Sequence, residues 1–107
     1  MNKTEARRLK VKRALKALIV NHNAFNIEDA EGGRIDFLVE GPFGHTYQCQ
    51  FTRNGFDVCV YDAISLAGDG WSDNDRRIQQ TAKELEFLMN ATVEKELEKV
   101  EALVASA

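Results

Sequence analysis

The feature that most constrains the fold is an Asn-Gly pair at residues 54 and 55, which lies between two runs of alternating residues. The runs are "TYQCQFT" before the pair and "FDVCVYD" after it. A two-residue type I′ turn needs positive φ at both central residues, which Asn and Gly adopt easily, so this arrangement predicts a β-hairpin. Such a turn would pair Arg53 with Phe56 and Phe51 with Val58.

This register predicts how the two cysteines are related. Cys49 pairs with Val60 and Gln50 pairs with Cys59, so the two sulfur atoms point to opposite faces of the sheet. Diverging Cβ vectors cannot form a disulfide without movement of the backbone, and neither cysteine has a second Cys or His at zinc-site spacing. We therefore expect structural thiols. The predicted core face holds Tyr47, Cys49, Phe51, Val58 and Val60, and the opposite face holds Gln48, Gln50, Phe56, Cys59 and Tyr61.

The rest of the chain predicts helices on either side of this hairpin. A helix from Thr4 to about His22 has apolar residues at spacings of three and four, a stripe that we extend to Phe25. The segment "NHNAFNIEDAEGG" supplies turn formers, "RIDFLVE" is a first strand, and "GPFG" is a tight turn. Helical periodicity then runs from Asp73 to about Ala105. The sequence predicts one α+β domain over residues 1–107, with a three-stranded antiparallel sheet and both main helices on one face.

The C-terminal helix is long for a domain of this size. As one helix it would extend about 50 Å, so we expect it either to break near Asn90–Thr92 or to project and pair with another chain. Residues 4–89 would then form an αβββα core and residues 90–107 a helical tail. A homodimer formed by this tail would use its apolar positions, Val93, Leu97, Val100 and Val104.

Charge is distributed unevenly along the chain, although its net value is only −3. Residues 1–17 hold seven Lys or Arg and one Glu, whereas residues 18–71 hold eight acids and two Arg. This asymmetry indicates two surfaces with different partners, or one end of the molecule neutralising the other. The basic residues that we assign to a nucleic acid or an acidic partner are Arg7, Arg8, Lys12, Arg13 and Lys16.

No catalytic motif is present, and we expect neither an enzyme nor a bound cofactor or metal. The chain lacks a P-loop, a GxGxxG and an HExxH sequence, and neither His22 nor His45 belongs to a known nucleophile motif. Acids in "AGDGWSDND" do not follow the calcium-loop spacing, and Ser72 with Asp75 fits a helix cap better. The chain has no apolar run of about 18 residues and no signal-peptide core, so we expect a cytoplasmic protein.

Two segments resemble the double-stranded-RNA-binding domain over roughly residues 4–89. The sequence "EGPFGHTYQCQF" is similar to that family's Gly-Pro-x-His loop and the strand after it, and "RRIQQTAKELEFL" is similar to its second helix. The resemblance implies an α-β-β-β-α fold and phosphate contacts from Arg76 and Arg77, while the third basic position of the helix falls at Gln80.

In size, element order and charge the chain also resembles small phage-encoded inhibitors, including anti-CRISPR proteins. That resemblance implies a non-enzymatic inhibitor that presents carboxylates to a host nucleic-acid-processing protein. Its contact surface would be an acidic loop with Asp69, Trp71, Asp73 and Asp75. We place this hypothesis first, a nucleic-acid-binding module using the basic helix second, and a self-associating accessory protein third. The expected partner is a protein or a nucleic acid, and not a membrane.

Overall fold

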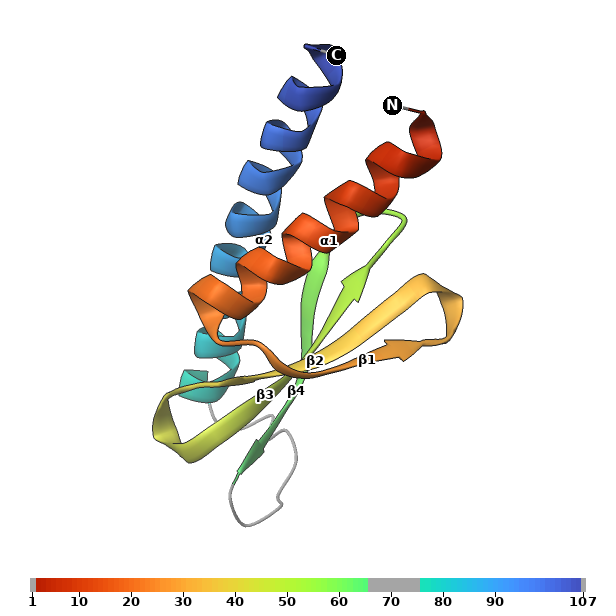
Figure 1. Ribbon diagram of the computed structural model, residues 1–107. Helices are drawn as coiled ribbons and strands as arrows, with labels where there is room; N and C mark the ends of the chain where they lie inside the picture. The colour runs from red at the N-terminus through yellow and green to blue at the C-terminus, as the bar shows by residue number, and fades with distance from the viewer. Residues whose placement is uncertain (1, 66–75, 107) are drawn as a thin grey trace.

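The computed structural model describes residues 2–65 and 76–106, which form two helices and a four-stranded sheet (Figure 1). The elements in chain order are α1 (Lys3–His22), β1 (Phe25–Ala30), β2 (Arg34–Glu40), β3 (His45–Thr52), β4 (Val58–Ser65) and α2 (Arg76–Ala105), with short 3-10 turns at Glu31–Gly33 and Pro42–Gly44. The strands form one antiparallel sheet in the order β1-β2-β3-β4, and both helices pack against one of its faces. The predicted α+β class and helix placement are confirmed, but the predicted strand number of three is wrong.

The strand that the sequence did not predict is β1. It pairs with β2, and the Gly pair after it forms the β1–β2 turn, with Gly32 and Gly33 at φ of 75° and 73°. Its side chains are almost all exposed, so the strand has no alternation of buried and solvated positions. Phe25, which the sequence analysis assigned to the stripe of the first helix, is instead an exposed residue of this strand.

Helix α1 begins and ends at residues suited to capping. The side chain of Asn2 accepts a hydrogen bond from the Glu5 N–H at 2.8 Å, and Asn23 adopts a left-handed conformation just after the last turn. The Ala24 N–H then donates to the Leu18 carbonyl at 3.3 Å, which closes the helix and directs the chain into β1.

The β3–β4 hairpin has the predicted register but not the predicted turn. Phe51 pairs with Val58, Gln50 with Cys59 and Cys49 with Val60. The connection is a four-residue loop: the Thr52 N–H donates to the Asp57 carbonyl, and the Phe56 N–H donates to the Thr52 carbonyl, both at 2.9 Å. Neither residue of the Asn-Gly pair has positive φ; Phe56 has it instead, at 56°.

The register of this hairpin fixes where Phe56 and the two cysteines lie. Phe56 belongs to the loop, so it does not pair with Arg53. It does not lie on the open face as predicted either: it comes two residues before Val58, so strand alternation already directs it to the core side, where it packs 6.3 Å from the Phe51 ring. Cys49 is buried and Cys59 is exposed, and both are free thiols, so the prediction that they face opposite ways is confirmed.

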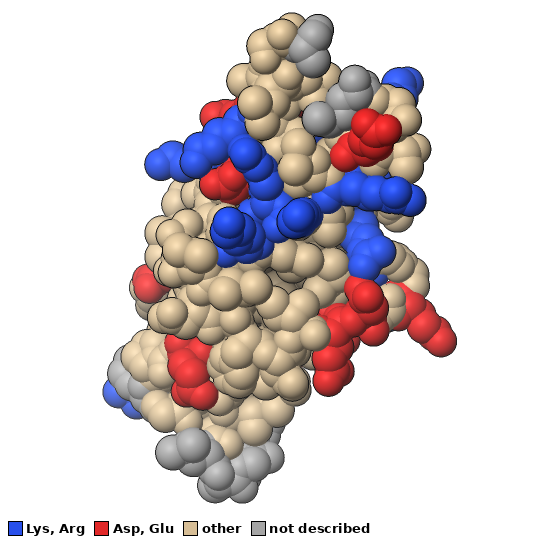
Figure 2. Space-filling model, in the orientation of Figure 1, with Lys and Arg blue, Asp and Glu red and all other residues tan. Residues whose placement is uncertain are grey.

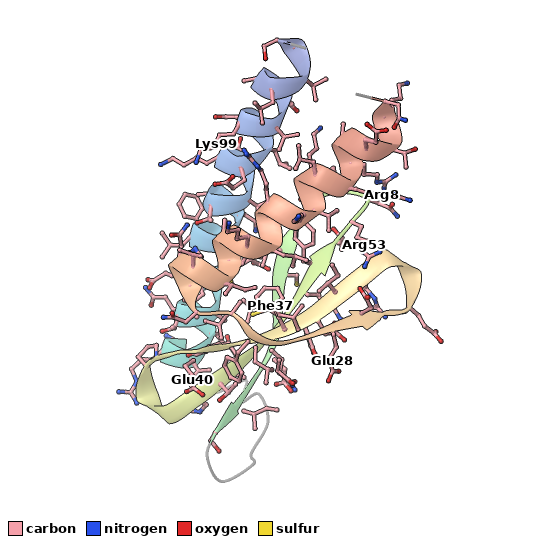
Figure 3. All side chains as sticks on the ribbon, viewed as in Figure 1. Arg8, Glu28, Phe37, Glu40, Arg53 and Lys99 are labelled. Atoms are coloured by element: carbon pink, nitrogen blue, oxygen red, sulfur yellow. The ribbon has the colours of Figure 1, made fainter. Side chains whose placement is uncertain are left out.

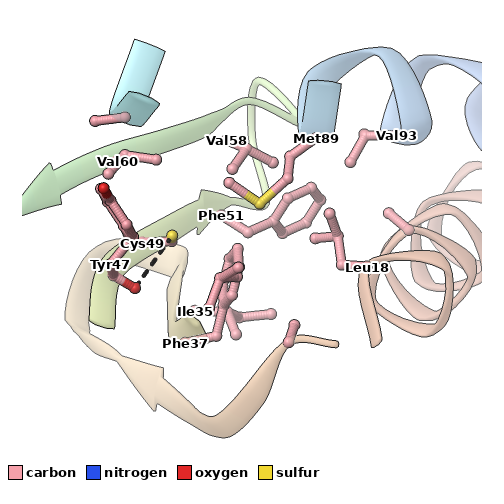
Figure 4. Packing of buried hydrophobic residues seen from close by; sticks show 14 of the residues in the cluster. Leu18, Ile35, Phe37, Tyr47, Cys49, Phe51, Val58, Val60, Met89 and Val93 are labelled. Carbon is pink, nitrogen blue, oxygen red and sulfur yellow. Dashed lines mark hydrogen bonds between the residues drawn. The ribbon is translucent and has the colours of Figure 1, made fainter. Parts of the chain in front are cut away.

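The core fills the space between the helices and the inner face of the sheet (Figure 4). Its largest fully buried side chains include Tyr47, Phe37, Phe51 and Leu18. All of the predicted core-face residues of the hairpin are buried. The "GPFG" turn packs closely against this core. A Cβ at Gly41 would lie only 2.1 Å from the Tyr47 ring, so the position requires glycine.

Helix α2 is continuous through residues 90–92, so of the two alternatives that the sequence left open, the break near Asn90–Thr92 is absent. Beyond that point it packs along α1, with Val93 and Val100 buried and Leu97 half-buried. The homodimer stays a prediction, but in this conformation Val93 and Val100 are covered by their own chain. Neither helix has a segment that is both long enough and apolar enough to span a bilayer, within the part of the chain described.

The edge of the sheet at β4 is completed by side chains of α2. Asn90 accepts from the Val58 N–H and donates to the Val58 carbonyl, both at 2.8 Å, and Glu86 accepts from the Val60 N–H at 3.1 Å. Glu86 and Asn90 are four residues apart, about 6 Å along the helix, and Val58 and Val60 are two residues apart, about 6.6 Å along the strand. The two spacings match, so each helix side chain lies beside its strand residue. Polar groups that an edge strand would otherwise expose are thereby satisfied.

Candidate functional site

The solvent-facing side of α1 and its neighbours form a basic band across one face of the molecule (Figure 2). Lys99 of α2 lies on one side of α1 and Arg53 of the β3–β4 loop lies on the other (Figure 3). We call the whole set the basic belt: Arg7, Arg8, Lys12, Arg13, Lys16, Arg53 and Lys99. The five predicted cations of α1 are therefore joined by two that the sequence did not indicate.

The cations of the belt differ in how they are held. Among the residues described, Arg8, Lys12, Arg13 and Lys16 form no ion pair. The remaining three are paired or hydrogen-bonded. Unpaired cations keep their charge available to a ligand, and four of them along one helix repel one another unless an anion binds.

Arg7 and Arg53 are fixed by contacts between α1 and the turns of the sheet. The Arg7 guanidinium donates to the Asn54 side-chain oxygen and, at 3.4 Å, to the Arg53 carbonyl. Arg53 itself forms an ion pair with Asp29 of β1. At the other end of the belt, Lys99 forms an ion pair with Glu96 at 3.1 Å.

Lys10 does not belong to the belt although it is basic and on the same helix. It points toward the sheet side, with its Nζ atom 5.7 Å from the Phe56 ring centroid and 3.6 Å from a Glu101 carboxylate oxygen. This residue connects α1 with the β3–β4 loop and with α2, so its role is structural.

Two open grooves flank α1 within the belt. One lies between α1 and α2, has a volume of about 460 Å³, and includes Arg13, Lys16 and Lys99 in its lining. The other lies between the first half of α1 and the turns of the sheet, with a volume of about 570 Å³. Its lining combines Arg8, Lys12 and Arg53 with apolar residues of α1.

The predicted site residues Arg76 and Arg77 are not part of the belt. Arg76 and Arg77 begin α2, about 35 Å along the helix from Lys99, so the two basic regions do not form one surface. Asp69, Trp71, Asp73 and Asp75 lie outside the described residues.

The face of the sheet opposite the helices is acidic, which the sequence analysis missed. Glu28 of β1 pairs with Asp36 of β2. Leu38 of β2 pairs with Gln48 of β3, which pairs in turn with Asp62 of β4. These residues lie on the open face, and so does Glu40. Because these acids come from three strands, no short motif reveals them; only the register of the sheet does.

Tyr61 also lies on the open face. It is 45% exposed and projects at a β-bulge in β4. Partial burial, then Asp36 and Asp62, raise the pKa of its hydroxyl.

Among the described residues, His22 has a side-chain partner on α2. His22 Nε2 lies 2.7 Å from the Thr92 hydroxyl oxygen, and burial lowers its pKa. His22 is half-buried. In residues 2–65 and 76–106, no group of three His, Cys, Asp or Glu side chains has an arrangement that could hold a metal ion.

Comparison with known proteins does not place the chain in a family. No protein-family model, no curated protein and no solved structure matches it. The resemblance to the double-stranded-RNA-binding domain is thus limited to the chain order of one helix, an antiparallel sheet and a second helix, with one strand more than that family has.

Proposed function

We propose that the protein is a non-enzymatic nucleic-acid-binding protein that uses the basic belt. The observation that supports this proposal is the group of four unpaired cations on the exposed side of α1, in a chain whose net charge is negative. The rest of the chain holds more acids than bases, so this concentration of positive charge favours binding of a polyanion in one orientation.

The length of the belt favours a polymer over a small anion. Arg8 and Lys16 are eight residues apart, about 12 Å along the helix axis, and Arg53 and Lys99 extend the belt on both sides of α1. A single phosphate could contact only part of this surface, whereas a nucleic-acid backbone would place several phosphates along it. Each neutralised phosphate releases counterions, which is the main source of affinity in such complexes.

The test is a salt-dependent binding titration with purified protein and labelled RNA and DNA strands, single and double. We expect Lys12→Gln/Lys16→Gln to weaken binding and to reduce the slope of log K against log salt by about two. Lys83→Gln/Lys95→Gln is the matched control, because both lysines are exposed on α2 outside the belt and the charge change is the same. Equal losses in the two variants, or no binding at low salt, would contradict the proposal.

A second candidate function is inhibition of a nucleic-acid-processing protein, which we placed first from the sequence. The acidic open face of the sheet favours it, because Glu28, Asp36, Glu40 and Asp62 lie beside exposed Tyr61 and half-buried Leu38, with Arg34 a neighbouring cation. Such a face could bind the basic channel of a target in place of nucleic acid. Partner capture that is competed by nucleic acid and lost in Glu28→Gln/Glu40→Gln would favour this function; capture unaffected by either would count against it.

A further inference from the structure

The groove between α1 and the turns of the sheet differs from an ordinary phosphate-binding surface. Val11 and Leu15 line it as half-buried aliphatic side chains, while Arg8 and Lys12 are exposed beside them. A surface that binds only phosphates needs cations but no apolar floor. We propose that this groove holds an unpaired base, so the preferred ligand is single-stranded nucleic acid; this inference rests on the proposed function and specifies its substrate class.

The size of the groove suits one base with its sugar. Its volume of about 570 Å³ falls within the range of about 300 to 1,000 Å³ that is usual for small-molecule sites. Such sites combine an apolar lining with a few polar groups that fix the orientation of the ligand. Here Val11 and Leu15 provide the apolar contact and the Asn54 side chain lies at the wall.

The wall opposite α1 is held in place before any ligand binds. The Arg53 N–H donates to the Gly33 carbonyl at 2.9 Å, which ties the β3–β4 loop to the β1–β2 turn. Arg7 ties the same loop to α1 by its bonds to Asn54 and Arg53, and Asp29 fixes the Arg53 guanidinium. Because these contacts already exist, binding requires little ordering of the wall.

The free cations are placed to hold the phosphates on either side of such a base. Arg8 and Lys12 are one helical turn apart on α1, about 6 Å along its axis, and neither forms an ion pair among the described residues. A strand could therefore place a base on Val11 and Leu15 and its phosphates on Arg8 and Lys12. The fixed Arg53 adds positive charge on the far wall.

A continuous duplex cannot use the groove in this way. Its bases are stacked and paired inside the helix, and its outer surface presents phosphates and sugars, which have no flat apolar face for an aliphatic floor. Unstacked bases of single strands and loops offer that face. Proteins stack such bases on aromatic or Arg side chains, and they hold flipped bases between aromatic or apolar side chains. The groove between α1 and α2 is more polar and includes Glu96, so it suits backbone contacts.

The experiment compares three labelled probes at one moderate salt concentration, and the two single-stranded probes have equal numbers of phosphates. They are a 12-nucleotide single strand, the same strand with abasic sites in place of bases, and a blunt duplex. The abasic probe keeps the charges and removes the bases. We expect the single strand to bind about tenfold more tightly than the abasic strand, and the duplex to bind about as weakly as the abasic strand.

Variants of the groove floor locate the base. Val11→Ala/Leu15→Ala should reduce the ratio of single-strand to abasic affinity toward one, whereas Ile19→Ala, an exposed aliphatic residue of α1 outside the groove, should leave it unchanged. Both affinities are measured on the same sample, so a fraction of unfolded variant cancels in their ratio.

The outcomes separate this inference from the proposed function. Equal affinity for all three probes would overturn the base-binding groove and leave nucleic-acid binding by the basic belt intact. A base-dependent affinity that the floor variants do not change would place the base elsewhere and also overturn the inference. No binding of any probe at low salt would overturn both the proposed function and the groove.

Discussion

Asn90 is the residue that joins the last helix to the last strand. Its amide makes hydrogen bonds of 2.8 Å to both backbone polar groups of Val58, and a third of 2.9 Å to the Glu86 carbonyl. Asn90→Ala should therefore lower the free energy of unfolding by about 2 kcal/mol, since it leaves part-buried backbone groups unpaired. Urea unfolding measures the change. Asn21→Ala, an exposed Asn on α1, is the control, and an equally small effect in both variants would contradict this role for Asn90.

Cys59 is the thiol whose reactivity the structure controls. Partial burial, a hydrogen bond to Glu86 and the charge of that carboxylate raise its pKa above the usual value of 9.0. A higher pKa leaves less thiolate at pH 8.5, so alkylation should be slower than for a free cysteine. Glu86→Gln removes the negative charge, which should lower the pKa and shift the pH-rate profile toward lower pH.

The control for that measurement lies in the same molecule. Burial, with the nearby Cys59 and Glu86, raises the pKa of Cys49 to about 12, so this thiol should stay unmodified while the protein is folded. Mass spectrometry of the alkylated protein distinguishes the two sites. An unchanged Cys59 profile in Glu86→Gln would show that the carboxylate does not control the thiol.

At the scale of elements, sequence patterns succeeded where one face of an element is buried. The register of the β3–β4 hairpin was predictable because its odd-numbered residues from Tyr47 to Phe51 all face the core. The turn was not, since a two-residue and a four-residue loop centred on the same pair give the same register. Strand β1 escaped prediction because neither of its faces is buried, which leaves no periodicity to detect.

The presence or absence of a sequence pattern also explains which residues of the basic belt could be predicted. The cations of α1 were visible because they are close together in sequence and lie opposite an apolar stripe. Arg53 and Lys99 were not, because tertiary contacts bring them to α1 from a loop and from the far part of α2. Their positions depend on a four-stranded sheet, which we did not predict, and on an unbroken α2, which was one of the two alternatives that the sequence left open.

The last part of α2 should be necessary for folding and not a separable tail. Ending the chain after Thr92 removes Val93, Leu97 and Val100, each buried or half-buried. Burial of such a side chain contributes about 1.5–3 kcal/mol, and three of them approach the whole stability of about 5–15 kcal/mol of a typical domain. We expect the shortened chain to lose cooperative thermal unfolding followed by circular dichroism. A chain ending at Val104 should unfold as the full chain does; if both do, the tail is dispensable.

At the scale of the whole molecule, charge is divided between two faces. The basic belt lies on the helix side, and the acids of the open sheet face lie on the other side of a molecule whose shorter dimensions are 24 and 20 Å. Whether the acids oppose nucleic-acid binding depends on how far their field extends through the solvent. The Debye length is about 30 Å at 0.01 M salt and about 8 Å at 0.15 M, so the acids act across the molecule at low salt and are screened at physiological salt.

The Debye length, compared with the thickness of the molecule, predicts how Glu28→Gln/Glu40→Gln binds nucleic acid. At 0.01 M salt the variant should bind a nucleic-acid strand a few-fold more tightly than the parent protein, because two repulsive charges are removed. At 0.15 M salt the two affinities should be the same. Fluorescence anisotropy titrations at both concentrations test this. A gain that persists at 0.15 M would mean that the strand passes close to Glu28 or Glu40, because only charges within about a Debye length still repel it there. The bound strand would then extend past the basic belt onto the sheet.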